Sequence, residues 1–226
     1  MFGRSRLVRL LIEKEESDQI LLATSEREHW YSVDLQLLNN SNLKNCFTPS
    51  NYDDETEEYL NNSFEISNNV CLQVMEWRLT QHHFKTLSVD KWAQSGPYDL
   101  ICALNLLDRH YAPSQLLQNL HSLALANDCF VLLSVVLPIN FYVEFNLKEE
   151  KKQDLLFLPF SRNKNNFKFN SFEKQAEILV NEVLIPAGFE IVRWTKLPYF
   201  SEGDLARAFY KLDDAVFLLK AIKLNK

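Results

Sequence analysis

Residues 98–104 read YDLICAL and residues 129–137 read CFVLLSVVL, and these two apolar runs decide the fold class. Between them, leucines recur at helical spacing after Ser114, which we expect to cap that helix. The second run is apolar on both faces, which is typical of a strand in the middle of a parallel sheet covered by helices. A strand, a helix and a second strand in this order predict a doubly wound α/β fold.

The same alternation extends along the chain from these two runs. Each further element is predicted from the spacing of its apolar residues and from the residues that end it, such as Pro186 and Gly188. No helix is predicted between the last two strands, so we expect them to be antiparallel neighbours. The further elements are helices over 67–81 and 172–184 and strands over 84–89, 189–195 and 215–219.

The first part of the chain carries a different pattern. Residues 1–63 read as helices and loops, and they begin with an amphipathic helix. The alternation of strands and helices begins at residue 64. We therefore predict an N-terminal helical segment over 1–63 and a doubly wound domain over 64–226.

Glycine is rare in this chain. Only four of the 226 residues are glycine, where an average chain of this length holds about sixteen. The four are too far apart for a G-x-G-x-x-G loop, a P-loop or a G-x-S-x-G nucleophile elbow. The sequence therefore excludes a dehydrogenase with a dinucleotide loop and a hydrolase with a nucleophile elbow.

Charge and cysteine usage narrow the function classes further. The net charge is −6 and the basic residues are scattered, which argues against nucleic-acid binding. The four cysteines form no C-x-x-C pair, and Cys102 and Cys129 lie inside apolar runs. We therefore expect buried, reduced thiols, no zinc site, and an intracellular, cytoplasmic protein. The longest apolar stretch, residues 129–139, is too short to span a bilayer, so we expect no transmembrane segment.

Polar side chains follow several of the predicted strands. In open α/β sheets, ligands bind outside the carboxyl ends of the strands. Two tyrosines lie on a long connection that we expect from Lys196 to Asp213. Each candidate side chain alone could instead cap a turn, form an ion pair or pack against the core, but together they define one candidate rim. The candidates are Glu65, Asn105, Asp108, Tyr199 and Tyr210.

Three long stretches of this sequence resemble one known family. The stretches ICALNLLDRHYAPSQLL, LLSVVLPINFYVE and AGFEIVRWTKLPYFSEGD, the last followed by YKLDDAVFLLK, are similar to the DREV methyltransferase family. The resemblance covers most of residues 28–222. It implies a Rossmann-like class I methyltransferase fold, S-adenosyl-L-methionine as cofactor, and methylation of protein histidine at the pros nitrogen. The implied partners are proteins with motifs of alternating histidine and small residues.

The resemblance also implies roles for the candidate residues. Asn105 matches a position beside the cofactor, and Asp108 matches the position that holds the substrate imidazole. Tyr199 and Tyr210 match aromatic positions that line the same pocket. Glu65 matches the acidic residue that holds the ribose hydroxyls of the cofactor. The family further implies association with endomembranes or mitochondria, for which the N-terminal sequence gives no support.

The chain departs from the family at the glycine-rich motif that cradles the methionine end of the cofactor. The sequence passes from Ser63 directly to Phe64 without this motif, so the resemblance implies a truncated fold that lacks the first strand and its loop. A splice variant, an incomplete gene and a decayed paralogue would each leave this pattern. Three hypotheses follow: an active histidine methyltransferase, a catalytically inactive variant that binds histidine-containing partner segments, and a chain that folds poorly and has no function of its own.

Overall fold

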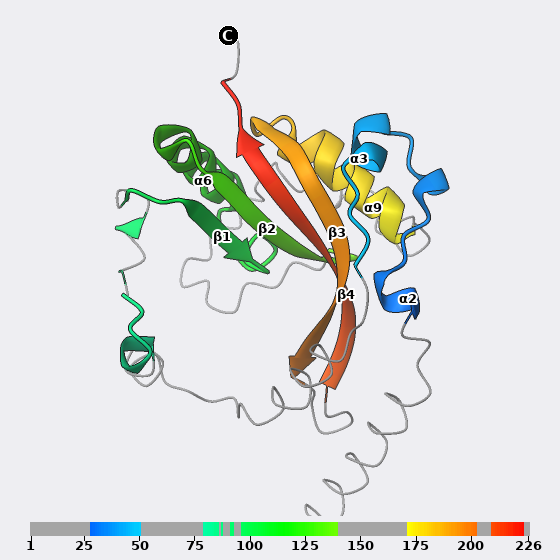
Figure 1. The fold of residues 1–226 in the computed structure, drawn as a ribbon, viewed down its shortest axis with the longest axis horizontal. Coiled ribbons are helices and arrows are strands. Elements are labelled where there is room, and N and C mark those ends of the chain that lie inside the picture. The colour runs from blue at the N-terminus through cyan, green and yellow to red at the C-terminus, as the bar shows by residue number, and fades with distance from the viewer. Residues whose placement is uncertain are drawn as a thin grey trace, which may run out of the picture.

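The computed structural model describes residues 28–50, 79–85, 87, 91–92, 96–139, 171–202 and 209–223 (Figure 1). Glu65, the predicted first helix and most of the helix predicted over 67–81 lie outside these ranges. The division of the chain at residue 64 stays a prediction. In the part of the chain that the structure describes, no helix is long and apolar enough to cross a membrane.

The described residues form one mixed four-stranded sheet in the order β1-β2-β4-β3. β1 is parallel to β2, and β4 is antiparallel to both of its neighbours. Both apolar runs are therefore strands, and the last two strands are antiparallel neighbours, as predicted. The strands are β1 (Leu100–Leu104), β2 (Phe130–Leu137), β3 (Phe189–Glu202) and β4 (Phe209–Ala221).

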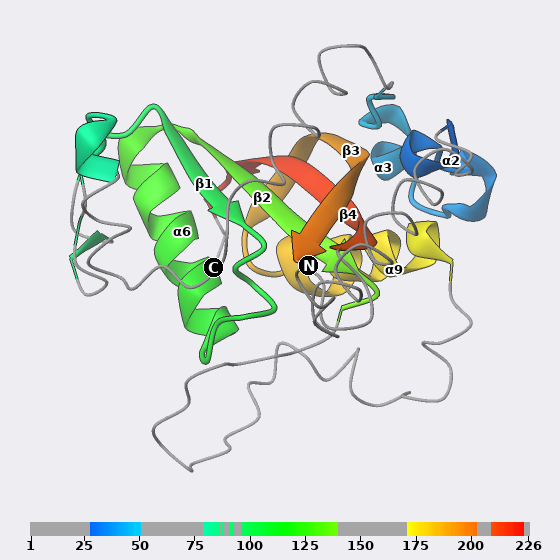
Figure 2. The ribbon, with the colours of Figure 1, turned by 90° about the horizontal axis from the view of Figure 1, so that it is seen from below.

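Two helices cover one face of the sheet. α6 (Pro113–Asn127) connects β1 to β2, and α9 (Phe172–Leu179) continues into a π-helical turn over Val180–Leu184 before β3. Both helices lie on the same side of the sheet (Figures 1 and 2). Alternate residues of β2 face them and are completely buried. The core of the molecule therefore lies between this face and the two helices.

On the opposite face of the sheet, the described part of the chain leaves apolar side chains of β1 and Phe130 of β2 exposed. Leu100 is 47% exposed and Leu104 is 56% exposed. Cys102 lies between them on the same side of the strand and is exposed, so the prediction that its thiol is buried is wrong. The reason is the alternation of a strand, because Ile101 and Ala103 point to the covered face and are buried there. Cys46, Cys102 and Cys129 carry free thiols.

Residues 28–50 of the N-terminal segment contact β3, the last strand in the order of the sheet. This segment contains α2 (Glu28–Tyr31), a 3-10 turn η1 (Leu35–Leu37) and α3 (Ser41–Asn45). The backbone N–H of Trp194 donates to Cys46 O, and the N–H of Thr48 donates to Trp194 O. These bonds form a parallel bridge at the outer edge of β3. The indole Nε1 of Trp194 also donates to Leu43 O at 2.7 Å.

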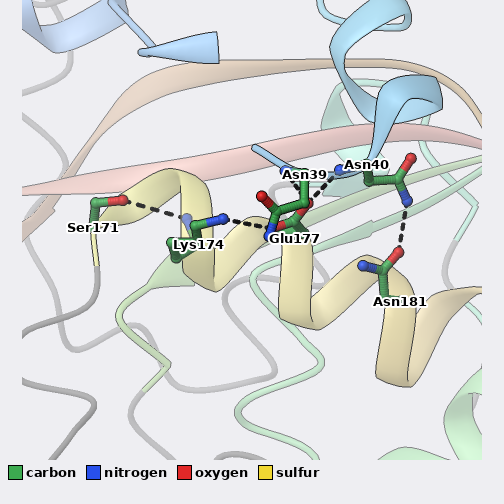
Figure 3. A network of polar contacts seen from close by, with 6 residues as sticks. All are labelled: Asn39, Asn40, Ser171, Lys174, Glu177 and Asn181. Atoms are coloured by element: carbon green, nitrogen blue, oxygen red, sulfur yellow. Dashed lines mark hydrogen bonds and ion pairs between the residues drawn. The ribbon is translucent and has the colours of Figure 1, made fainter. Parts of the chain in front are cut away.

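A buried carboxylate holds the same segment against α9. Glu177 accepts hydrogen bonds from the backbone N–H groups of Asn39 and Asn40 and from Lys174 Nζ (Figure 3). Burial alone would raise the pKa of Glu177, but the bonds from Lys174 and the two backbone N–H groups outweigh burial and lower that pKa. The carboxylate of Glu177 therefore stays ionised. It accepts hydrogen bonds from two backbone N–H groups, those of Asn39 and Asn40, that have no partner within a helix.

Three local predictions are wrong, each for a physical reason. Ser114 does not cap α6, because Pro113 takes the first turn and Ala112 is the N-cap with no side-chain bond. The long connection predicted from Lys196 to Asp213 is instead mostly strand, since β3 and β4 pair out to Glu202 and Phe209. Residues 84, 85 and 87 of the strand predicted over 84–89 are described, and none of them is in a strand.

Candidate functional site

The candidate site lies at the carboxyl ends of the parallel strands β1 and β2 (Figure 1). Asn105 is the first residue after β1, and its φ of 50° places it in the left-handed region that asparagine tolerates. Its backbone N–H donates to Ser134 O at 3.1 Å and to Ser134 Oγ at 3.0 Å. The backbone of Asn105 is therefore fixed against β2, and only its side chain is left to adjust.

The side chain of Asn105 reaches across to the neighbouring strand β4. Its Nδ2 donates to Asp214 Oδ2 at 3.4 Å. Asp214 lies opposite Val136 in the ladder and is only 6% exposed. Sequence reasoning did not single out Asp214. One feature of the sequence could have indicated Asp214: it is a carboxylate next to the apolar run AVFLL, at a strand position where an apolar residue would be expected.

Asp108 lies in the turn that follows Asn105 and is 4% exposed. Arg109 Nε donates to Asp108 Oδ2 at 3.3 Å, and the Arg109 side chain itself is half-exposed. The buried carboxylate of Asp108 is therefore paired with a guanidinium group that reaches the solvent. Asp108 Oδ1 is buried and has no hydrogen-bond partner.

Burial raises the pKa of both carboxyl groups. The pKa of Asp214 is raised to about 6 by burial and by the charge of Asp108, against the hydrogen bonds of Ser134 and Asn105. Burial also raises the pKa of Asp108, and Arg109 opposes that rise. The charge of Asp108 is thus one of the causes that raise the pKa of Asp214. Perturbed carboxyl groups of this kind are typical of functional sites.

The site holds three buried oxygen atoms with no hydrogen-bond partner. They are Asn105 Oδ1, Asp108 Oδ1 and Asp214 Oδ1. Unpartnered buried acceptors are rare and destabilise a fold by about 1–3 kcal/mol each. Because the amide oxygen and the ionised carboxylates can only accept, a ligand that satisfies them must present N–H or O–H donors.

The two tyrosines lie farther along the hairpin. Tyr199 pairs with Leu212 and Tyr210 pairs with Ser201, so strand alternation places both tyrosines on the sheet face of Asp214. Tyr210 is four residues from Asp214, which is roughly 13 Å along a strand. The structure thus brings Asn105 to Asp214, with Asp108 in the turn after Asn105, and it makes Tyr199 a diagonal neighbour of Asp214 on the same face, while Tyr210 lies farther along β4. Glu65 lies outside the described residues.

The strand order, the parallel β1-α6-β2 unit and the polar site at the strand ends define an α/β protein with a mixed sheet. A family model described as DREV methyltransferase matches residues 73–221. The chain therefore belongs to the DREV methyltransferase family, as the resemblance implied. Its sheet is consistent with a truncated Rossmann-like methyltransferase fold.

The described residues do not provide a glycine cradle for the methionine end of S-adenosylmethionine. Gly96 precedes β1 and Gly188 precedes β3, which is the opposite end of the sheet from the acceptor atoms. Gly188 serves packing there, because a Cβ at this residue would stand 2.6 Å from His121 Nε2. Among the described residues, the unpartnered acceptors fit a ligand that donates hydrogen bonds, and no glycine loop lies beside them. Within the described ranges, no three His, Cys, Asp or Glu side chains gather as metal ligands do.

Proposed function

We propose that the chain is a protein-histidine methyltransferase that acts at the pros nitrogen, with S-adenosylmethionine as methyl donor. The observation that carries the proposal is the group of buried acceptors at Asn105, Asp108 and Asp214. A neutral imidazole presents one N–H donor and one lone pair, which suits an acceptor site of this kind. Membership of the DREV methyltransferase family supports the reaction class. The proposed partners are proteins with alternating histidine motifs.

Asp108 would select which nitrogen of the imidazole reacts. If Asp108 Oδ1 accepts the Nε2–H of the substrate, the lone pair is left on Nδ1, the pros nitrogen. Histidine has an ordinary pKa near 6.5, so much of it is neutral at pH 7 and no strong base is needed. Arg109 favours the ionised form of Asp108, which is the form that accepts this hydrogen bond.

A second candidate function is histidine binding without catalysis. The observation that favours it is the position of the described glycines, neither of which lies beside the acceptor atoms. Such a variant would keep the substrate site at Asn105 and Asp108 and would bind histidine-containing partner segments. It would differ from the methyltransferase only in its affinity for the methyl donor.

Calorimetric titration of the purified 226-residue chain with S-adenosylmethionine distinguishes the two functions. Micromolar binding supports the methyltransferase, and mass spectrometry of an alternating histidine–alanine peptide should then show added methyl groups at the pros nitrogen. No binding of S-adenosylmethionine by a folded chain that binds the peptide supports the second candidate. Loss of peptide binding as well as cofactor binding contradicts both.

A further inference from the structure

We infer that Asp214 is a positioning residue for this site, which fixes the Asn105 carboxamide so that Asn105 Oδ1 is kept as an acceptor for the substrate. The inference rests on the proposed function, because it assigns a part in substrate binding to a residue of the same site. Asp214 differs from the candidate residues above in that it acts on the substrate through Asn105.

The carboxamide of Asn105 can adopt two orientations that differ by half a turn. A carboxamide has a donor end and an acceptor end of nearly the same shape, and rotation by half a turn exchanges them. The backbone of Asn105 is held by Ser134, so this rotation is the remaining freedom. An ionised carboxylate only accepts, so Asp214 Oδ2 binds the Nδ2 end at 3.4 Å. Asn105 Oδ1 is then left unpartnered, as observed.

Protonation of Asp214 would favour the opposite orientation of the Asn105 carboxamide. A protonated carboxyl group has a donor, which can be given to Asn105 Oδ1 and would turn the NH₂ group toward the substrate. The pKa of Asp214 is raised to about 6 by burial, so the reversal falls in the pH range in which histidine itself becomes charged. At low pH, protonation of Asp214 therefore removes an acceptor from the site, and protonation of histidine removes the neutral imidazole.

The groups around Asp214 are consistent with this assignment. The charge of Asp108, in the turn after β1, raises the pKa of Asp214, while Ser134 on β2 lowers that pKa. On β4 itself, Asp213 points to the other face, where it pairs with Lys196 at 3.5 Å and Lys211 at 2.8 Å. These two lysines therefore neutralise Asp213 rather than Asp214.

The test compares Asp214→Asn with the matched variant Asp213→Asn in the full chain. The probe is a synthetic peptide of alternating histidine and alanine, titrated by calorimetry at pH 5.5 and pH 7.5. We expect Asp214→Asn to bind about tenfold more weakly than wild type at pH 7.5, the size of one hydrogen bond. The loss should be much smaller at pH 5.5, where most of Asp214 is already protonated. Asp213→Asn should match the wild type at both values.

A second measurement does not depend on peptide binding or on the folding of a variant. In the ¹⁵N-labelled wild type, the side-chain amide resonances of Asn105 should shift with a midpoint near pH 6. Resonances that do not move between pH 5 and pH 7 overturn the inference. Equal peptide affinity and an equal pH profile in Asp214→Asn also overturn it and leave the proposed function standing. A folded wild type that binds no peptide contradicts the proposed function, while the resonance titration still tests whether Asp214 fixes the Asn105 carboxamide.

Discussion

Asp108 and Asp214 bring two carboxyl groups into a part of the molecule with little access to water. Each has one oxygen without a partner, and burial raises the pKa of each. A fold selected only for stability would replace them with apolar residues, because ionised buried groups are costly. Their presence at the ends of β1 and β2 is therefore best explained by ligand binding.

The raised pKa of Asp214 makes the stability of the chain depend on pH. Its pKa is about 6 in the folded chain against an ordinary value of 3.8, so the folded state binds more protons between these values. The free energy of unfolding should therefore fall as pH rises from about 4 to about 6, by an amount on the order of 3 kcal/mol. In Asp214→Asn the part of this fall that Asp214 contributes should be absent.

Urea denaturation at pH 4.5 and pH 7.5 measures the effect. Asp213→Asn is the control, since Asp213 lies on the opposite face and this variant keeps the buried Asp214. Asp108 contributes a pH dependence of the free energy of unfolding that has the same sign, and this contribution remains in both variants. An Asp214→Asn chain that keeps the whole wild-type pH dependence contradicts the account of Asp214.

At the scale of elements, α9 holds the N-terminal segment through acidic side chains. Glu173 Oε1 accepts the backbone N–H of Asp34 at 3.0 Å, and Glu177 accepts those of Asn39 and Asn40 (Figure 3). The segment so held contributes Leu43 to the core beside Trp194. The attachment of the segment therefore depends on a few buried charge-assisted hydrogen bonds.

Glu177→Ala should lower the free energy of unfolding by about 2–4 kcal/mol, because it leaves two backbone donors without a partner. Glu182→Ala is the matched control on the next turn, where the side chain is exposed, and it should change the stability by less than about 0.5 kcal/mol. Thermal denaturation of both variants measures the difference. Equal midpoints would show that Glu177 does not hold the segment.

Several elements could be predicted from the sequence because one strong local pattern decided each of them. The runs over 98–104 and 129–137 are short and apolar, and Leu133 in the middle of the second run is completely buried in β2. α9 has a clear apolar stripe that ends before Pro186. The length of the β3–β4 hairpin could not be predicted, because its outer part is held by cross-strand pairing that local composition does not reveal.

The candidate site was predictable only in part, for a related reason. Asn105 and Asp108 follow the first apolar run directly. The rule that ligands bind outside the carboxyl ends of strands therefore identifies them as candidates. Asp214 comes from a strand 109 residues later, and only the register of β2 with β4 brings it to Asn105. Contacts of this kind depend on the folded sheet and leave no local pattern in the sequence.

At the scale of the whole molecule, the described helices cover one face of the sheet, and β1 is the first strand in its order. In the described ranges, β1 pairs only with β2, and its outward residues Leu100 and Leu104 are about half exposed. An apolar strand with an unpaired edge favours self-association.

The exposed side of β1 in the described residues should be detectable by the reactivity of its thiol. Cys102 is exposed, whereas Cys129 is 6% exposed and burial raises its pKa. Iodoacetamide at pH 8 should therefore modify Cys102 at least about tenfold faster than Cys129, because burial limits both the access to Cys129 and its thiolate fraction. Mass spectrometry of digested samples measures both rates in one reaction. Equal protection of the two thiols would show that the face of β1 is covered.

The most direct test of the account is the affinity of the folded chain for an alternating histidine–alanine peptide, measured by calorimetry for wild type and Asp108→Asn at pH 7.5. The account predicts that wild type binds the peptide and that Asp108→Asn binds at least about tenfold more weakly, since the variant loses the ionised acceptor for the imidazole N–H. Equal binding by the two proteins would contradict the claim that the buried acceptors at the ends of β1 and β2 receive the histidine side chain.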